Sequence, residues 1–174
     1  NAIATAVPSF IGGSADLAPS NKTELKDLGD FPKGRNIHFG IREHSMAAIT
    51  NAMALYGTTI PFNATFFVFS DYLKPSARIA ALTNIQNFFV WTHDSIGVGE
   101  DGPTHEPIEH ISQFRALPNF YVWRPADATE NVEAWRTALG MKAPHGFVLS
   151  RQKLKTLKPK RDFGEVSKGA YIVK

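Results

Sequence analysis

The chain has 174 residues, of which 43% are hydrophobic, enough for one sizeable core and too few for two ordinary domains. It contains no run of 18 apolar residues and no basic segment leading into an apolar stretch near residue 1, so we expect neither a membrane partner nor a secretion signal. Because it has no cysteine, disulfide frameworks and thiolate metal sites are excluded, and a cytoplasmic location is favoured.

The net charge of +3 is unevenly distributed along the chain. Residues 1–150 carry 11 Lys and Arg against 14 Asp and Glu, a net charge of −3. The surplus comes from a basic run near the C-terminus that contains Arg151, Lys153, Lys155, Lys158, Lys160 and Arg161. No aromatic residues are interleaved with this run, as they are in many nucleic-acid-binding patches, so we interpret it as a solvated linker and expect no nucleic-acid partner.

Short apolar runs rich in Val, Ile and Phe alternate with segments of helical period, a pattern typical of βαβ units. It predicts an α/β fold with a mostly parallel sheet flanked by helices. The expected strands are Phe10–Gly12, Asn36–Phe39, Thr59–Phe66, Asn87–Thr92, Phe120–Trp123 and Gly146–Ser150.

Two amphipathic helices are predicted between these strands. Apolar residues recur at helical spacing at Met46, Ile49, Met53 and Tyr56, and again at Val132, Trp135 and Leu139, and we expect both rows to face the core. Asp127 can cap the second helix, with Glu130 three residues on, and Pro144 should end it by about residue 142. Residues 154–168 then form a connector to a further element at 171–173.

Polar residues gather directly after the expected strands, at 12–20, 40–44, 65–72 and 93–105. In open parallel sheets ligands bind beyond the carboxyl ends of the strands, so these clusters are candidate sites. The 93–105 segment is the richest, and we interpret it as a substrate loop. A phosphate cradle there is disfavoured because Glu100 and Asp101 would repel a phosphate. A zinc helix through His105 and His110 is disfavoured because Pro107 interrupts it.

Spacing alone does not assign a role to Glu43 or to a row of three aromatic residues. Glu43 lies in the first turn of a predicted helix, where the helix dipole by itself favours a carboxylate. Phe66, Phe69 and Tyr72 recur every three residues and either pack in the core or line one side of a strand-to-helix turn.

Three motifs together resemble the middle, aminopyrimidine-binding domain of transketolase. They are Gly-Ser-Ala-Asp-Leu followed by Pro-Ser, Gly-Ile-Arg-Glu-His, and the loop His-Asp-Ser-Ile-Gly-Val-Gly-Glu-Asp-Gly-Pro-Thr-His, in the order and spacing of that family. The resemblance implies a thiamine diphosphate-binding fold, with the pyrimidine-binding domain at 1–153 and a linker toward a C-terminal domain at 154–174. The intact enzyme would transfer a two-carbon ketol unit from a ketose phosphate to an aldose phosphate, a reaction of the pentose phosphate pathway.

The resemblance also implies roles for the cofactor-side residues. Glu43 matches the catalytic glutamate that hydrogen-bonds N1′ of the aminopyrimidine and promotes the imino tautomer, which removes the thiazolium C2 proton. We expect such a carboxyl group to lie in a dry pocket. Phe66, Phe69 and Tyr72 match aromatic residues that pack around the pyrimidine, and Asp16 matches a residue near the thiazolium.

On the substrate side, the resemblance implies that His93, Asp101 and His105 face the sugar. Asp101 would read the configuration of a ketose hydroxyl, and His105 would act as a catalytic residue by hydrogen-bonding the carbonyl oxygen where charge develops. Ser20, His93 and Arg151 match positions that hold the sugar phosphate, where a guanidinium can bind two oxygens at once.

No segment resembles the family's metal-binding motif, so magnesium or another divalent cation is expected on the N-terminal domain. In the family that domain comes from a second subunit of a homodimer, and we therefore expect the isolated chain to be inactive. Two alternatives are a non-catalytic assembly module of the same fold and a domain of another thiamine enzyme, such as a deoxyxylulose-phosphate synthase. The first is disfavoured because Glu43, His93, Asp101 and His105 are all retained. The second is disfavoured by the wording of the 93–105 loop.

Overall fold

A six-stranded sheet forms the centre of the computed structural model, which describes residues 1–157 and 163–171. All neighbouring strands are parallel, in the order β2-β1-β3-β4-β6-β5. The strands are β1 Phe10–Ser14, β2 Asn36–His38, β3 Ile60–Phe66, β4 Phe88–Thr92, β5 Tyr121–Trp123 and β6 His145–Leu149. Each of the six expected strands is present, with ends that differ by two residues at most, and the predicted α/β fold is confirmed.

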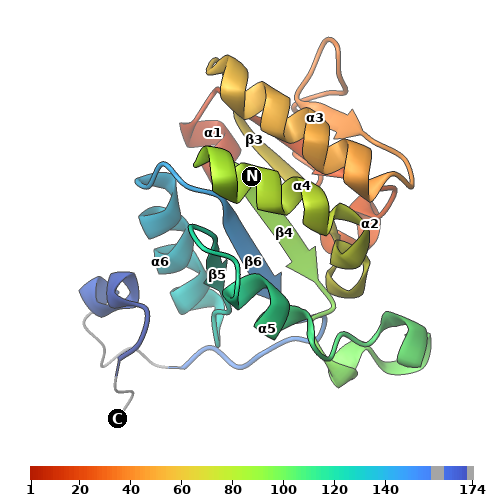
Figure 1. Cartoon of the computed structure of the whole chain (residues 1–174), viewed down its shortest axis with the longest axis vertical. Helices are drawn as coiled ribbons and strands as arrows, with labels where there is room; N and C mark the ends of the chain where they lie inside the picture. The colour runs from red at the N-terminus through yellow and green to blue at the C-terminus, as the bar shows by residue number, and fades with distance from the viewer. Residues whose placement is uncertain (158–162, 172–174) are drawn as a thin grey trace.

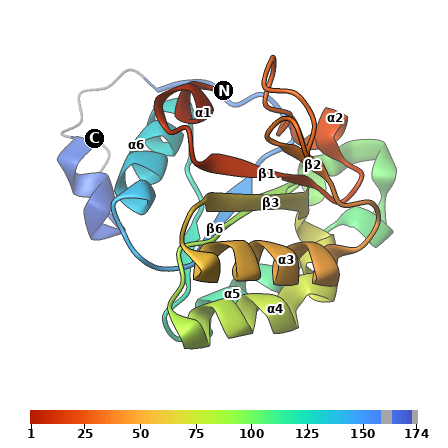
Figure 2. The same ribbon diagram turned by 90° about the horizontal axis from the view of Figure 1, so that it is seen from above.

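Helices cover both faces of this sheet (Figures 1 and 2). The helices α3 Glu43–Tyr56, α4 Ser70–Thr83 and α5 His110–Arg115 lie on one face. On the other face lie α1 Ala2–Ala6 and α6 Ala128–Leu139. Shorter elements connect them: α2 Ala18–Asn21 and the 3₁₀ turns η1 Phe67–Phe69, η2 Ile96–Asp101, η3 Pro103–His105 and η4 Phe163–Lys168. None of the helices in the described ranges has the length and apolar character needed to cross a membrane.

The strand β4 shows why the sheet needs two layers of helices. All five of its residues are buried, and their side chains alternate between the two faces. Phe89 and Trp91 join the core beneath α3, α4 and α5, while Phe88 and Val90 join the core beneath α1 and α6. A continuous apolar run in the sequence therefore becomes a strand that belongs to two hydrophobic cores.

Close packing between the strands depends on glycine at two positions. A Cβ atom at Gly12 would lie 1.9 Å from the carbonyl oxygen of Phe62 on β3, and one at Gly146 would lie 2.4 Å from the ring of Trp91. Neither glycine can be replaced by a residue with a side chain unless a neighbouring strand or ring moves. Gly12 thus allows β1, which carries the first polar cluster, to lie against β3.

The predicted buried face of α3 is wrong in part. Met46 is fully buried, but Ile49 is 48% exposed and Tyr56 is 82% exposed. The helix faces the sheet through small and polar residues instead, and its buried positions are Glu43, Met46, Ala47, Thr50 and Asn51. Two buried amides, Asn63 on β3 and Asn87 just before β4, hydrogen-bond Thr50 at 2.9 and 3.0 Å. Polar partners rather than apolar periodicity therefore set the rotation of this helix.

A similar correction applies to α6. Val132, expected in the core, is 63% exposed, whereas Ala134 and Ala138 face the sheet. Small residues allow the helix to approach closely, and Trp135 stacks on Phe147 at 4.0 Å between ring centroids. The predicted ends of the helix are confirmed: the Asp127 side chain accepts hydrogen bonds from the first turn, and the last helical residue is Leu139.

The connector expected at 154–168 contains the short turn η4, which packs against α6 with Val166 buried. Of the element expected at 171–173, residues 172 and 173 lie outside the described residues. Residues 158–162 of the connector also lie outside them.

Candidate functional site

The polar clusters that follow the strands meet at one edge of the sheet, because all the strands are parallel. In Figure 1 the arrowheads of β4 and β6 point toward the loop that contains η2 and η3. A pocket of about 540 Å³ opens at this edge. Its walls are formed by Ala15, Asp16, Leu17, Ile41, Glu43, Phe69 and Tyr72. The structure thus brings four of the predicted cofactor-side residues around a single cavity.

Glu43 is the charged group on the buried side of this pocket. Gly40, with φ of +70°, turns the chain after β2, so that α3 begins at Glu43. The residue is only 8% exposed, which confirms the expected burial. Within the described part of the chain its carboxylate has no hydrogen bond and no ion pair. Because Glu43 lines the open pocket, its acceptor oxygens are available to a ligand bound there.

The three aromatic residues form a row that runs from the core to the surface. Phe66 ends β3 and is 7% exposed, Phe69 lies one turn later, and Tyr72 is 65% exposed. The Phe66 and Phe69 rings stack at 5.9 Å, and Phe69 and Tyr72 are 6.3 Å apart. Phe67 points into the core and is fully buried. Both interpretations of the spacing therefore apply, since the inner end of the row packs in the core and the outer end lines the pocket.

His93 extends this aromatic row. Its ring stacks on Phe66 at 3.7 Å between centroids, with an interplanar angle of 24°, and it is 5% exposed. Burial lowers the pKa of His93, and the neighbouring Asp101 opposes that effect, while Arg151 and His105 lower the pKa further. The imidazole is therefore neutral at pH 7, and three more of the predicted residues are near enough to influence it.

The loop from His93 to His105 is held at its base by a buried carboxylate. Asp94 is 6% exposed and pairs with Arg124 at 3.0 Å, and it also accepts a hydrogen bond from Ser150 at 3.4 Å. These contacts fix the start of the loop to the strands β5 and β6. The sequence patterns did not single out Arg124, because the pair joins residues 30 positions apart.

The remaining predicted residues are more open. His105 meets the edge of the Phe69 ring at 5.3 Å, and Arg151 forms an exposed ion pair with Glu100 at 3.4 Å. Ser20 is exposed on α2, and in the described ranges its side chain has no hydrogen bond to another candidate residue. The other predicted residues therefore lie around the pocket or around His93 and the aromatic row, whereas no contact in the described ranges links Ser20 to them.

Three buried polar residues beside His93 were given no role by the sequence. Ser14, Asn21 and Thr92 are each less than 10% exposed and hydrogen-bond one another at the ends of β1, α2 and β4. For Ser14 and Thr92 the position beside a predicted strand end was the available signal. The bond between Thr92 and Asn21 spans 71 residues of sequence and could not be read from local spacing.

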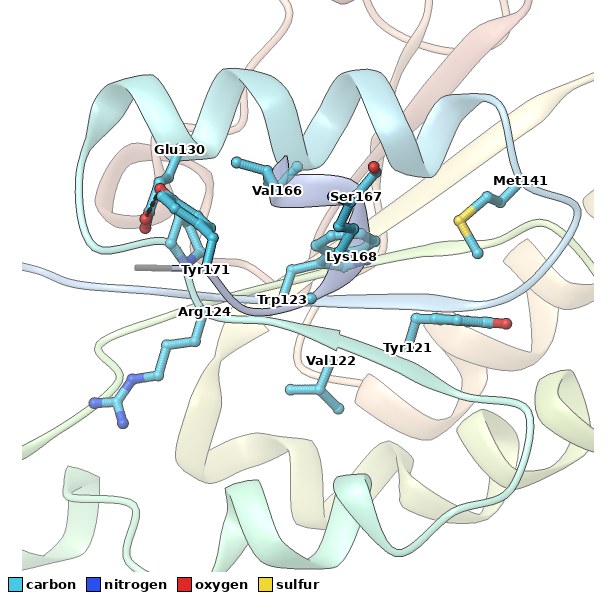
Figure 3. A pocket seen from close by; sticks show the side chains of 13 residues that line it. Tyr121, Val122, Trp123, Arg124, Glu130, Met141, Val166, Ser167, Lys168 and Tyr171 are labelled. Carbon is cyan, nitrogen blue, oxygen red and sulfur yellow. Dashed lines mark hydrogen bonds between the residues drawn. The ribbon is translucent and has the colours of Figure 1, made fainter. Parts of the chain in front are cut away.

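Two other features lie outside this site. A pocket of about 300 Å³ lies between β5, α6 and η4 and is lined by Tyr121, Trp123, Met141 and Tyr171 among others (Figure 3). It contains none of the predicted site residues. His110 is buried between the exposed carboxylates of Asp71 and Glu109, at 3.2 and 3.9 Å. This cluster joins the starts of α4 and α5.

The comparisons with known proteins agree on one family. Residues 1–156 match the family described as the transketolase pyrimidine-binding domain. The chain is 54% identical over 180 residues to a transketolase of Geobacillus stearothermophilus, covering 99% of this chain and 27% of that protein.

Solved structures show the same relationship. A transketolase from Campylobacter jejuni is 66% identical with a TM-score of 0.89, covering 90% of this chain and 25% of that one. A Pichia stipitis transketolase in complex with sedoheptulose 7-phosphate is 44% identical with a TM-score of 0.93, covering 97% of this chain and 26% of that one. The chain thus spans about a quarter of the length of these relatives. It belongs to the transketolase pyrimidine-binding domain family.

Proposed function

We propose that this chain forms the aminopyrimidine side of the active site in a transketolase that uses thiamine diphosphate. The observation that carries the proposal is Glu43, a buried carboxylate that has no partner among the described residues and lines a pocket with Phe69 and Tyr72. In the intact enzyme a two-carbon ketol unit would pass from a ketose phosphate to an aldose phosphate.

The pocket fits a protonatable aromatic ring. Phe69 and Tyr72 offer apolar surface to the ring, and Glu43 offers an acceptor at the same wall. When bound, thiamine diphosphate would supply an acidic carbon that can serve as the nucleophile toward a ketose carbonyl. Glu43 acts by sharing a proton with a ring nitrogen, and the buried Phe66 ring, stacked on Phe69, helps to exclude water. Asp16 lies at the same pocket and is proposed to face the thiazolium side.

Sugar phosphates are the proposed substrates, bound beside the same pocket. Asp101 and His105 belong to the loop beside the aromatic row, where they can contact sugar hydroxyl and carbonyl groups. Arg151 and Ser20 are proposed to hold the phosphate, with His93 nearby. The Pichia relative, solved with sedoheptulose 7-phosphate, supports this class of ligand.

The other half of the site is proposed to come from outside this chain. Ile41 and Tyr72 at the pocket are 78% and 65% exposed, which supports coverage by another domain. We propose that this is the N-terminal domain of a second subunit in a cytoplasmic homodimer, which also holds magnesium or another divalent cation with the diphosphate. Residues 1–153 would then be the pyrimidine-binding domain and 154–174 the linker to a third domain.

The test for Glu43 uses the full-length enzyme and hydrogen–deuterium exchange at C2 of bound thiamine diphosphate, followed by NMR. Glu43→Gln keeps the shape of the side chain but removes its capacity to take a proton, so we expect exchange to slow by about 10²-fold or more. Glu133→Gln on α6 is the matched control and should exchange at the wild-type rate. Wild-type exchange in Glu43→Gln would reject the assignment.

The test for Arg151 compares phosphorylated and unphosphorylated ketose donors. Arg151→Ala should raise KM for the phosphorylated donor by about tenfold or more and change KM for the unphosphorylated donor little. Lys153→Ala, in the same exposed basic run, is the control for loss of a positive charge. Equal effects of Arg151→Ala on both donors would contradict a phosphate role.

A further inference from the structure

His110, the first residue of α5, lies between two carboxylates. Its side chain is 4% exposed, and its ring packs against the buried Phe67 at 5.4 Å between centroids. Asp71 Oδ2 lies 3.2 Å from Nε2, and Glu109 Oε2 lies 3.9 Å from Nδ1. Neither ring nitrogen makes a hydrogen bond within the described part of the chain. The buried imidazole therefore faces two acceptors without bonding to either of them.

An imidazolium ion held between two carboxylates does not explain these contacts. Each N–H of such a ring would point at a carboxylate oxygen within about 3.2 Å. The Glu109 contact is too long, and the Asp71 oxygen is close enough but lies off the line of a hydrogen bond. The exposed pair of His38 and Asp30 shows the difference, because there the two groups form a hydrogen bond at 3.0 Å.

The same spacing fits two ligands of one metal ion. Zinc–nitrogen and zinc–oxygen bonds at a tetrahedral angle place the two ligand atoms about 3.3 Å apart, with the oxygen off the axis of the nitrogen lone pair. His110 Nε2 and the Asp71 oxygen are 3.2 Å apart. One ligand atom from each of Asp71, Glu109 and His110 lies within 4.8 Å of the other two. A movement of the exposed Glu109 carboxylate by about 1.5 Å completes a three-ligand site.

The surroundings leave both carboxylates available to a cation. In the described ranges neither Asp71 nor Glu109 forms an ion pair with a lysine or arginine. Glu109 Oε1 accepts a hydrogen bond from Gln113 Nε2 at 3.3 Å, so Oε2 is the oxygen turned toward His110. Lys74, one turn after Asp71, donates to Gln113 Oε1 rather than to either carboxylate. Gln113 thus orients a ligand in the way that supporting residues do in metal sites.

We propose that Asp71, Glu109 and His110 form a binding site for a divalent transition metal ion such as Zn²⁺. The imidazole and the two carboxylates supply three ligands, and the exposure of the carboxylates leaves the fourth position to water. The nitrogen ligand favours Zn²⁺ over Mg²⁺, which prefers oxygen and retains its water. The inference does not rest on the proposed function, and it does not use the zinc helix that Pro107 interrupts.

A bound ion would link two elements beside the pocket. Asp71 precedes Tyr72 of the pocket wall on α4, and His110 begins the helix that follows the 93–105 loop. Only the folded chain brings the three ligands together, so zinc should stabilise it. Free zinc at about ten times its dissociation constant should raise the Tm of the 174-residue chain by about 3–6 °C. Asp71→Asn should show no such rise at the same zinc concentration.

Binding is measured by isothermal titration of the metal-free 174-residue chain with ZnCl₂ at pH 7.5. We expect the cluster to bind one zinc ion per chain and His110→Gln to abolish this binding. Asp71→Asn and Glu109→Gln alter exposed side chains and should each weaken it by about tenfold or more. The matched controls are Asp30→Asn and His38→Gln, which remove the other pair of a histidine and a carboxylate and should leave the zinc affinity unchanged.

Four results would overturn the proposal. The first is absence of zinc binding by the wild-type chain, and the second is wild-type affinity in both Asp71→Asn and Glu109→Gln. These exposed variants decide the outcome even if His110→Gln does not fold. The third is loss of binding in His105→Gln with retention in Asp71→Asn, which would place the ion in the 93–105 loop. The fourth is displacement of zinc by about a hundredfold excess of Mg²⁺, which would mean that the ligands are oxygen alone.

Discussion

His145, at the start of β6, is expected to make the protein sensitive to acid. It is fully buried and stacks on Phe88 at 5.4 Å between centroids. Its Nδ1 accepts a hydrogen bond from the Trp123 indole at 3.0 Å, and Nε2 faces the Met141 carbonyl at 3.4 Å. Protonation of Nδ1 would place its N–H against the indole N–H of Trp123 inside the core. The neutral Nε2–H form is therefore the one that the fold accommodates.

The size of the effect follows from the pKa. Burial lowers the pKa of His145 from 6.5 to about 4, while the bond to the Met141 carbonyl opposes the shift. This difference corresponds to about 3 kcal/mol. The unfolded chain takes up the proton below about pH 6.5 and the native chain only near pH 4. The free energy of unfolding is thus unaffected by this group above pH 6.5 and falls as the pH drops toward 4.

The assay is urea denaturation of the chain, followed by tryptophan fluorescence, at pH values from 7.5 to 4.5. His145→Gln keeps a donor and an acceptor but cannot titrate. Because it loses the buried ring that stacks on Phe88, it should be less stable than wild type at pH 7.5. By pH 5 the difference in the free energy of unfolding between the two proteins should be smaller by about 2 kcal/mol, because only the wild type is destabilised by acid. His93 contributes a slope of the same sign, but both proteins retain it. His38→Gln controls for the loss of an exposed histidine at pH 7.5, where the stability should change little.

Parallel pH curves for wild type and His145→Gln would refute this reasoning. They would mean that the native state accepts the proton as readily as the unfolded chain. A rearranged contact between Trp123 and residue 145, visible as a change in the indole N–H resonance, would then have to accompany acidification.

Three further predictions concern stability and the loop. Phe66→Ala removes a ring that is 7% exposed and stacked between two others, so urea denaturation should show a loss of about 3 kcal/mol. Arg124→Gln leaves the buried Asp94 without its cation, which should cost about 1 kcal/mol or more and hasten proteolysis within residues 93–105, as limited digestion would reveal. Gly12→Ala should prevent folding because its Cβ meets backbone at 1.9 Å, whereas Gly57→Ala, with φ of +86° and open space, should lower thermal stability by only about 1 kcal/mol. Equal losses for the two glycine variants would contradict the steric argument.

Local patterns in the sequence were sufficient to place the sheet. Apolar runs predict strands because a buried strand needs apolar residues on both faces, and β4 is such a strand. Polar residues directly after those runs predicted one site at one edge, since parallel strands all end there. The sequence likewise indicated the cap of α6, because Asp127 and its partners lie within three residues of one another.

Only the tertiary structure decided which polar groups meet. Thr92 bonds Asn21 across 71 residues, and Arg124 reaches Asp94 across 30, because the strand order β2-β1-β3-β4-β6-β5 brings their strand ends together. Apolar periodicity misplaced Ile49, since α3 rotates to satisfy buried amides in and beside the sheet. The sequence by itself determined the strands, the motifs and the edge where they converge. The partners of each buried polar side chain depended on the packing, because hydrogen bonds are specified by position in space rather than by spacing along the chain.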